Sequence, residues 1–390
     1  VRTRRALVVT EFALAMILLV GAGLLVRSLW SVENVDLGFR SERVLSVSLA
    51  PPVSTATAQR ADFYKRVLEQ IGSLPGVESA GVTSELFVSG NSARVVTVEG
   101  DARPVSEGLR FRSDELSEEL FKAIGTPLLR GRFFSAADGP DSPPVAIIND
   151  AMARRLWPGR DPIGRRFKFG PGDSRQPWFT VVGLVGDMRR QGLENDPIPQ
   201  MFEPLAQNPP RQAILLIRTS MDDPLKMAGA VQAAVRRVEK HAPLYGVTTL
   251  EIRLGAFLTE RRFQTWLLIG FSAVALLMAA IGIYGLIQYS IATRTHEIGI
   301  RMAVGAQAGE IFRMIIGEGL KLSLTGLALG LVGALWLGGA VSSLLFGVAA
   351  TDPLTFISVS LLLTAVATAA CYFPARRAMQ VEPVVALRQQ

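Results

Sequence analysis

The sequence predicts an α-helical membrane protein with four transmembrane helices and an α+β extracytoplasmic domain held on helical stalks. Nearly half of the 390 residues are hydrophobic (49%), and the mean hydropathy is +0.31, which is too apolar for an ordinary soluble domain of this size. Two apolar runs, at residues 263–293 and 322–351, contain no Asp, Glu, Lys or Arg. Each run is longer than the ~20 residues that a helix needs to cross a bilayer.

The first span is expected within residues 6–26, which follow Arg2, Arg4 and Arg5 and are interrupted only by Glu11. A basic start before an apolar stretch also fits a signal peptide, but this run is long and lacks a small-x-small cleavage site. We therefore expect an uncleaved helix whose N-terminus is cytoplasmic. For Glu11, we expect pairing with a nearby arginine or snorkelling to the membrane edge, with a functional role as the alternative.

Residues 31–262 are soluble in character, and the first span places them outside the cytoplasm. A strand at 43–50, a helix at 58–71 and a strand at 77–83 predict a split βαβ-type subdomain. Further short strands are expected at 94–99 and 109–113, with a helix from an N-cap at Ser117 to 124. A second mixed β subdomain is expected to follow, with strands at 145–148, 178–185 and 213–219 and helices from Asn149 or Asp150 to 156 and over 224–239.

No catalytic or metal-binding pattern accompanies this soluble region in the sequence. His241 is its only histidine, the single cysteine is Cys371 in the last apolar run, and neither CxxC nor HExxH spacing occurs. Asp187 could be an acid catalyst, but capping or turn bonding is expected because no base or nucleophile stands near it in sequence. Trp157 and Trp178 are expected in the core or at a subdomain interface.

The overall charge and the motifs of the sequence argue against two further functions, nucleic-acid binding and ATP hydrolysis. The net charge of +7 fits basic residues on the cytoplasmic side plus a basic outer surface, and no nucleic-acid-binding motif accompanies it. The sequence contains no G-x-x-x-x-G-K-[ST] motif, so we expect no ATP hydrolysis by that route in this chain. We therefore expect neither an enzyme nor a nucleic-acid partner.

Three further spans follow the soluble region. The second lies within 263–293 and should continue a stalk helix that begins near Leu254; the third lies within 311–346, and the fourth runs from Pro353 to Phe373. Odd-numbered spans run outward and even-numbered spans return, so both termini are expected in the cytoplasm. Small residues in the third span allow close helix packing, either within the chain or at a seam between two copies of the chain. These residues are Gly326, Gly330 and Gly333.

A short charged segment separates the second and third spans. Glu297 and Arg301 stand four residues apart, so they can pair on one helical face, and Gly305 is a candidate C-cap. One interpretation is an amphipathic helix that lies on the lipid headgroups. The other is a coupling element that docks into a groove on a cytosolic partner.

The sequence of this segment, THEIGIRMAVGA at residues 295–306, resembles the signature of FtsX-like permease domains in MacB-type ABC transporters. In that family the segment is the cytoplasmic coupling helix that contacts the ATP-binding subunit. The resemblance therefore implies a coupling helix at residues 294–306. The coupling residues that it implies are Glu297, Ile298, Gly299, Ile300, Arg301, Met302, Gly305 and Ala306.

The rest of the chain shows the same resemblance. Residues 156–164 (LWPGRDPIG) and 181–192 (VVGLVGDMRRQG) resemble the MacB-like periplasmic core domain, and residues 374–388 resemble the family's C-terminal ending. The domains expected are a cytoplasmic N-terminus with the first span (1–30), a MacB-like core with stalks (31–262), an FtsX-like domain (263–377) and a cytoplasmic tail (378–390).

The resemblance implies a permease subunit in the bacterial inner membrane, with ATP and Mg²⁺ held by a separate cytosolic ATP-binding subunit. Such permeases work by mechanotransmission, and the large core favours export. The implied partners are the ATPase, the lipid bilayer, a second permease copy or a fused tandem half, and a periplasmic or outer-membrane protein. Val1 as first residue would fit one half of a duplicated orphan permease. The alternative is an FtsX-like regulator of an extracytoplasmic partner such as a cell-wall hydrolase.

Overall fold

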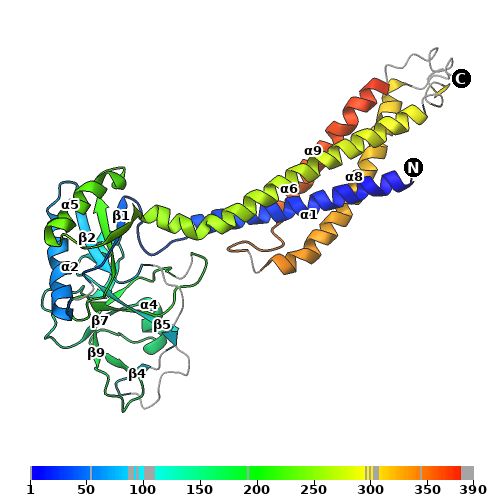
Figure 1. Cartoon of the computed structure of the whole chain (residues 1–390). Helices are drawn as coiled ribbons and strands as arrows, with labels where there is room; N and C mark the ends of the chain where they lie inside the picture. Colours follow the sequence, from blue (N-terminus) through cyan, green and yellow to red (C-terminus); the bar gives the residue numbers. More distant parts are fainter. Residues whose placement is uncertain are drawn as a thin grey trace. The chain divides into compact units, whose positions relative to one another are not determined.

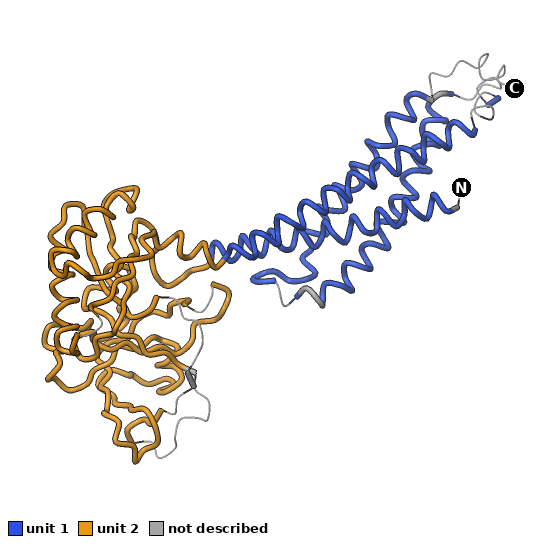
Figure 2. The backbone as a smooth tube through the Cα atoms, in the orientation of Figure 1, with its two compact units in different colours: residues 1–34, 258–390 blue, residues 35–257 orange. Residues whose placement is uncertain are grey.

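The computed structural model divides the chain into two compact units (Figure 2). Unit 1 comprises Val1–Asn34 and Leu258–Gln390, and unit 2 comprises Val35–Phe257. The structure describes residues 2–52, 55–86, 92–93, 96–100, 110–190, 193–294, 297, 300–301, 307–342 and 345–378.

Unit 1 is a bundle of long apolar helices (Figure 1). Within the described residues, four helices are long and apolar enough to cross a membrane, which confirms the predicted number of spans. These helices are α1 (Arg2–Glu33), α6 (Leu250–Thr293), α8 (Ala308–Val341) and α9 (Pro353–Ala378).

The bundle buries one set of apolar side chains and leaves another set exposed. Phe12 and Met16 on α1 are fully buried against the other helices, whereas Trp266, Ile281 and Trp336 are 70%, 69% and 83% exposed. Water would penalise so much exposed apolar surface, but lipid would not. The outer face of the bundle is therefore suited to contact with acyl chains.

Helix α6 is much longer than a membrane span. It contains 44 residues, which correspond to ~66 Å at about 1.5 Å per residue, against a hydrocarbon core of ~30 Å. The boundary between the units falls within it, after Phe257. The continuous stalk and second span predicted from Leu254 onward are thus confirmed.

Unit 2 is an α/β domain built on a mixed sheet. Its strands lie in the order β12–β1–β11–β2–β5–β10–β7–β9–β8–β4, with β3 paired to β5 and β6 paired to β9. The strands are β1 (Val44–Leu49), β2 (Val77–Thr83), β3 (Ser92–Ala93), β4 (Val96–Val98), β5 (Arg110–Leu116), β6 (Leu128–Gly131), β7 (Val145–Asn149), β8 (Arg166–Phe169), β9 (Phe179–Val185), β10 (Gln200–Pro204), β11 (Ala213–Thr219) and β12 (Leu244–Thr249).

Among the described residues, two hydrophobic cores on this sheet stand out. In the first, α2 (Thr57–Gly72) and α5 (Ala228–Val238), which follows the short 3₁₀ helix η1 (Pro224–Met227), pack on β1, β11 and β2. The alternate residues Leu45, Val47 and Leu49 all enter this core, as a period of two requires. In the second, α4 (Asp150–Leu156) packs on β7, β8 and β9.

The two halves of the sheet are joined weakly. Strands β2 and β5 share a single residue pair, Thr83 with Leu116, whereas β2 and β11 are paired along most of their length. The predicted strands 77–83 and 213–219 are confirmed with the same bounds. Strands β10 and β12 were not predicted.

Local capping agrees with the prediction at helix α4 and differs from it at helix α3. Asn149 caps α4, since its side-chain oxygen accepts from the Met152 amide, and Asp187 accepts from the Ala151 amide, as expected for a capping role. The expected N-cap at Ser117 is wrong. Helix α3 (Leu120–Ile124) begins after Glu119, and the Ser117 hydroxyl instead accepts a hydrogen bond from the buried Val82 amide of β2.

Candidate functional site

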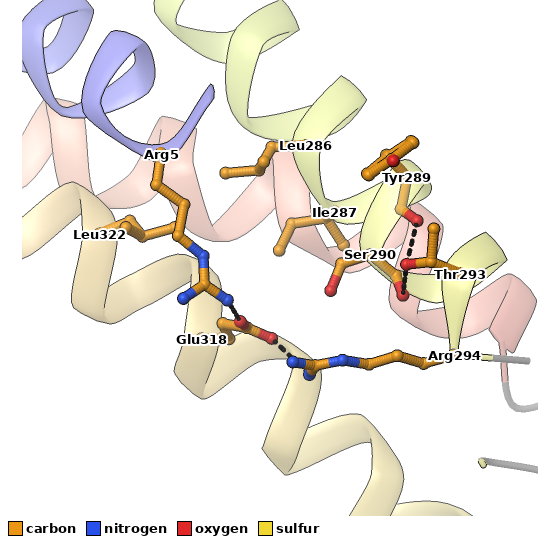
Figure 3. A pocket seen from close by; sticks show the side chains of 9 residues that line it. All are labelled: Arg5, Leu286, Ile287, Tyr289, Ser290, Thr293, Arg294, Glu318 and Leu322. Atoms are coloured by element: carbon orange, nitrogen blue, oxygen red, sulfur yellow. Dashed lines mark hydrogen bonds and ion pairs between the residues drawn. The ribbon is translucent and has the colours of Figure 1, made fainter. Parts of the chain in front are cut away.

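The candidate site lies at one end of unit 1, where a single carboxylate joins three helices. Glu318 of α8 pairs with Arg5 of α1 through one oxygen and with Arg294, at the end of α6, through the other at 3.3 Å (Figure 3). We call this part of the bundle the Glu318 end. Because each arginine comes from a different helix, the carboxylate couples the positions of α1, α6 and α8.

A small cavity lies beside this ion-pair network. Figure 3 shows its lining, which includes the apolar side chains of Leu286, Ile287 and Leu322 together with the charged groups of the network. Its volume is 60 Å³, room for a few water molecules but not for a substrate. The cavity is thus a packing gap beside the network, and the chemistry available here is ion pairing.

Helices α1 and α6 also meet through a cation and an aromatic ring. The Arg4 guanidinium lies 4.2 Å from the centroid of the Tyr289 ring. Such contacts contribute about 0.5–1 kcal/mol at exposed sites. The N-terminal turn of α1 is therefore held to the end of α6 by a second interaction, independent of Glu318.

The predicted coupling residues continue from this end of α6. Glu297 and Arg301 form the expected i,i+4 ion pair, at 2.6 Å, and Ile300 is 45% exposed. The Arg301 guanidinium also lies 3.2 Å from the Met314 sulfur of α8. Ile298, Gly299, Met302, Gly305 and Ala306 lie outside the described residues.

The glycines singled out in the third span line the contact between α8 and α1. An added Cβ would lie 2.6 Å from Phe12 Cβ at Gly326, 2.6 Å from Met16 Cβ at Gly330 and 2.8 Å from Ile17 Cδ1 at Gly333. Real Cβ atoms do not approach so closely. This geometry favours the intramolecular packing interpretation over a seam between two copies.

Sequence reasoning assigned no role to Glu318. A lone acid close to arginines, in a helix that runs into lipid, is the signal that could have identified it, because an unpaired charge there is costly. A similar cluster at the other end was also missed. Asp352 caps α9 by accepting from the Thr355 amide at 2.9 Å, and it also pairs with Arg27 of α1.

Unit 2 carries a larger groove at the junction of its two halves. The groove has a volume of 1040 Å³ and is lined in part by Arg60, Arg112, Glu85, Glu115 and His241. Burial raises the pKa of Glu115 above its usual range. The size and polar lining would suit a ligand, but the part of the chain that the structure describes contains no group of His, Cys, Asp or Glu able to hold a metal ion.

Comparison with known proteins identifies the family. Residues 7–255 match the MacB-like periplasmic core domain, and residues 269–383 match the FtsX-like permease C-terminal domain. The first match alone covers more than half of the chain. The chain therefore belongs to the MacB/FtsX-like family of ABC transporter permeases.

Individual relatives agree with this assignment. The macrolide export ATP-binding/permease protein MacB of Marinobacter nauticus is 27% identical over 300 residues, which are 72% of this chain and 44% of the relative. MacB of an Azoarcus species is 31% identical over 278 residues (68% and 40%). The pyoverdine export ATP-binding/permease protein PvdT of Pseudomonas aeruginosa is 26% identical over 278 residues (68% and 40%). The chain thus spans less than half the length of these relatives.

Among solved structures, the periplasmic region of MacB from Actinobacillus actinomycetemcomitans superposes with a TM-score of 0.39 at 12% sequence identity. The alignment covers 57% of this chain and 95% of that chain.

Proposed function

We propose that this chain is the permease subunit of an ABC transporter, and that it couples ATP hydrolysis on a separate cytosolic subunit to movement of an extracytoplasmic domain, for export. The observation that carries the proposal is the Glu318 carboxylate. It joins α1, α6 and α8 beside the segment that holds the Glu297–Arg301 pair. Family membership supports the transporter class, and the names of the curated relatives support export.

In the proposed mechanism, the ATPase contacts the coupling segment at residues 294–306 differently in its two nucleotide states. Only such a difference can shift the equilibrium of the permease. Movement at Arg294 passes through Glu318 to α8 and Arg5. It also passes along α6, which is continuous from Leu250 to Thr293, so the helix can transmit a displacement without a hinge in the described residues.

The proposed placement in the bacterial inner membrane has both termini and the Glu318 end in the cytoplasm and unit 2 outside. Basic residues near the chain ends and the coupling segment support it, because cytoplasmic loops carry an excess of Lys and Arg. ATP and Mg²⁺ are assigned to the partner subunit, and this chain is assigned no catalysis. A second copy or a fused tandem half would complete the membrane part, and an extracytoplasmic partner is proposed for unit 2.

A pull-down from native membranes in mild detergent tests this function, with ATPase activity measured in the eluate. We expect an ATP-binding cassette protein to co-purify with the wild type and to be lost with Glu297→Lys, which replaces an attractive pair with a repulsive one. Glu251→Lys is the matched control, because it reverses an exposed charge at the opposite end of α6. The control variant should retain the ATPase.

Failure of the wild type to retain any ATPase would contradict the proposal. Retention by both variants would remove the coupling role of Glu297 but not the permease assignment. If the ATPase is retained and export of candidate substrates is absent from cells, the regulator alternative replaces export. In that case the extracytoplasmic readout would be the activity of a cell-wall hydrolase.

A further inference from the structure

A stripe of two cations and a glycine follows one face of α8 at the Glu318 end. Arg313, Gly317 and Lys321 are spaced four residues apart, so they share a helix face. Together with Arg5 of α1 they line an open groove of 480 Å³, whose other lining residues include Met314 and Leu322. This groove lies next to the small cavity of Figure 3 but is much larger.

The groove carries more positive charge than its acid can neutralise. Glu318 is the only carboxylate among the described residues that line it, and it is already shared between Arg5 and Arg294. Arg313 and Lys321 are exposed and form no ion pair with any residue that the structure describes. The groove therefore keeps two cations available for a ligand.

The middle of the stripe is open. A Cβ added at Gly317 would meet no heavy atom of the described chain within 4 Å. The rise from Arg313 to Lys321 is ~12 Å at about 1.5 Å per residue. A phosphate group fits between the two cations, above a glycine that leaves room for it.

The position along α8 also restricts the ligand. Lys321 is the last charged residue before the apolar run 322–351, so the groove lies at the edge of the hydrocarbon if α8 spans the membrane. Leu322 and Met314 supply apolar surface directly beside the charges. A ligand that combines a phosphate with an acyl chain matches both halves of this lining.

We propose that this groove binds the headgroup of an anionic phospholipid, with its phosphodiester held by Arg313, Lys321 and Arg5 and its acyl chain beside Leu322. Basic pockets between helices on the cytoplasmic side are suited to such headgroups. The proposal rests on the membrane insertion assumed in the proposed function, but it does not depend on an ATPase partner. The proposal implies that the lipid phosphate and Glu318 compete for Arg5. Bound lipid would therefore weaken the ion pair that links α1 to α8.

Native mass spectrometry of the purified full chain tests this proposal, using phosphatidylglycerol, phosphatidylcholine and soluble glycerol phosphate as probes. We expect wild type to retain phosphatidylglycerol in clear preference to phosphatidylcholine. Arg313→Gln with Lys321→Gln should reduce that preference about tenfold or more, since each basic residue near an anionic surface contributes about 1 kcal/mol. Arg376→Gln with Arg377→Gln, which removes two exposed cations of α9 outside the groove, should leave it unchanged.

Gly317→Leu provides a second test that keeps every charge. It should lower phosphatidylglycerol retention by filling the gap, and it remains informative if the double variant is unstable. Equal retention of the two lipids by wild type would overturn the proposal. The proposal would also fail if the α9 control variant lost the preference for phosphatidylglycerol as strongly as the Arg313→Gln, Lys321→Gln variant. Competition by glycerol phosphate at the concentrations where lipid binds would assign the site to a free phosphate compound instead.

Discussion

The two ends of the helical bundle hold their charges in different ways. At the end where Asp352 lies, which we call the Asp352 end, an ion pair is combined with bonds to backbone groups: Asp352 pairs with Arg27 and accepts from the Thr355 amide, and Ser28 accepts from the Phe346 amide at 2.8 Å. At the Glu318 end, the links are ion pairs between side chains of three helices. The arrangement at the Asp352 end fixes a loop to a helix. At the Glu318 end, by contrast, each ionic side chain can pair with another charged group without disturbing the backbone.

This difference matches the proposed division of roles. The bond from the Thr355 amide to Asp352 cannot be exchanged without breaking the cap of α9, so the Asp352 end is expected to move as one piece. Exposed side-chain ion pairs each contribute little, so the Glu318 end can be rearranged by a partner or a lipid at small cost. Besides the continuous helix α6, the contact that can carry movement between the ends is the packing of α8 on α1.

The largest effect is expected from breaking that packing. Gly330→Leu places a side chain where an added Cβ would already lie 2.8 Å from the Ala13 carbonyl oxygen, and overpacking of this kind costs about 3 kcal/mol. We expect a clear drop in the thermal unfolding midpoint in detergent. Gly285→Leu on α6 is the control, because an added Cβ there meets no described atom within 4 Å. Equal destabilisation by both variants would contradict the packing argument.

A smaller loss is expected at the Asp352 end. Asp352→Ala removes the cap of α9 and the pair with Arg27, and loss of a cap costs about 1–2 kcal/mol. Asp352→Asn keeps an oxygen for the Thr355 amide and should therefore cost less. Thermal unfolding of the three proteins checks this order. Identical midpoints for the Ala and Asn variants would mean that the cap contributes nothing.

The sequence predicted most of the elements because their patterns are local. The spans are long apolar runs, and the strands at 77–83 and 213–219 follow hydrophobic signals that end at turns. Strand β12 was missed because it lies at the edge of the sheet with half of its residues exposed, so no alternation of apolar and polar residues marks it. What stabilises β12 is its pairing with β1, which is distant in sequence.

The site was predicted only where its residues are close in sequence. The Glu297–Arg301 pair follows from helical spacing alone. By contrast, Glu318 is 313 residues from Arg5, and only the packing of α8 on α1 brings them together. The Ser117 cap failed for the same reason, since the amide that its hydroxyl binds belongs to a strand 35 residues earlier.

At the Glu318 end, Glu318→Gln should affect coupling far more than stability. Both arginines stay partly exposed and can be hydrated, so we expect the free energy of unfolding to change by less than about 1 kcal/mol. ATPase activity of the complex should become independent of the permease, because α1 and α8 no longer follow Arg294. Unfolding curves and ATPase assays of the same preparations measure both effects. A large loss of stability would show that the network is a structural core element.

The smallest effect is expected from pH at the Asp352 end. Hydrogen bonding from Thr355, followed by the pair with Arg27, lowers the pKa of Asp352 to about 2. The unfolded value is ~3.9, so the carboxylate's stabilisation is complete at neutral pH and is lost as pH falls from ~4 towards 2. The difference in unfolding midpoint between wild type and Asp352→Asn should stay constant from neutral pH to ~5 and narrow below ~4. If the difference in unfolding midpoint narrowed already near neutral pH, another group at this end would have to titrate there. The Asp352 end would then be sensitive to pH near neutrality.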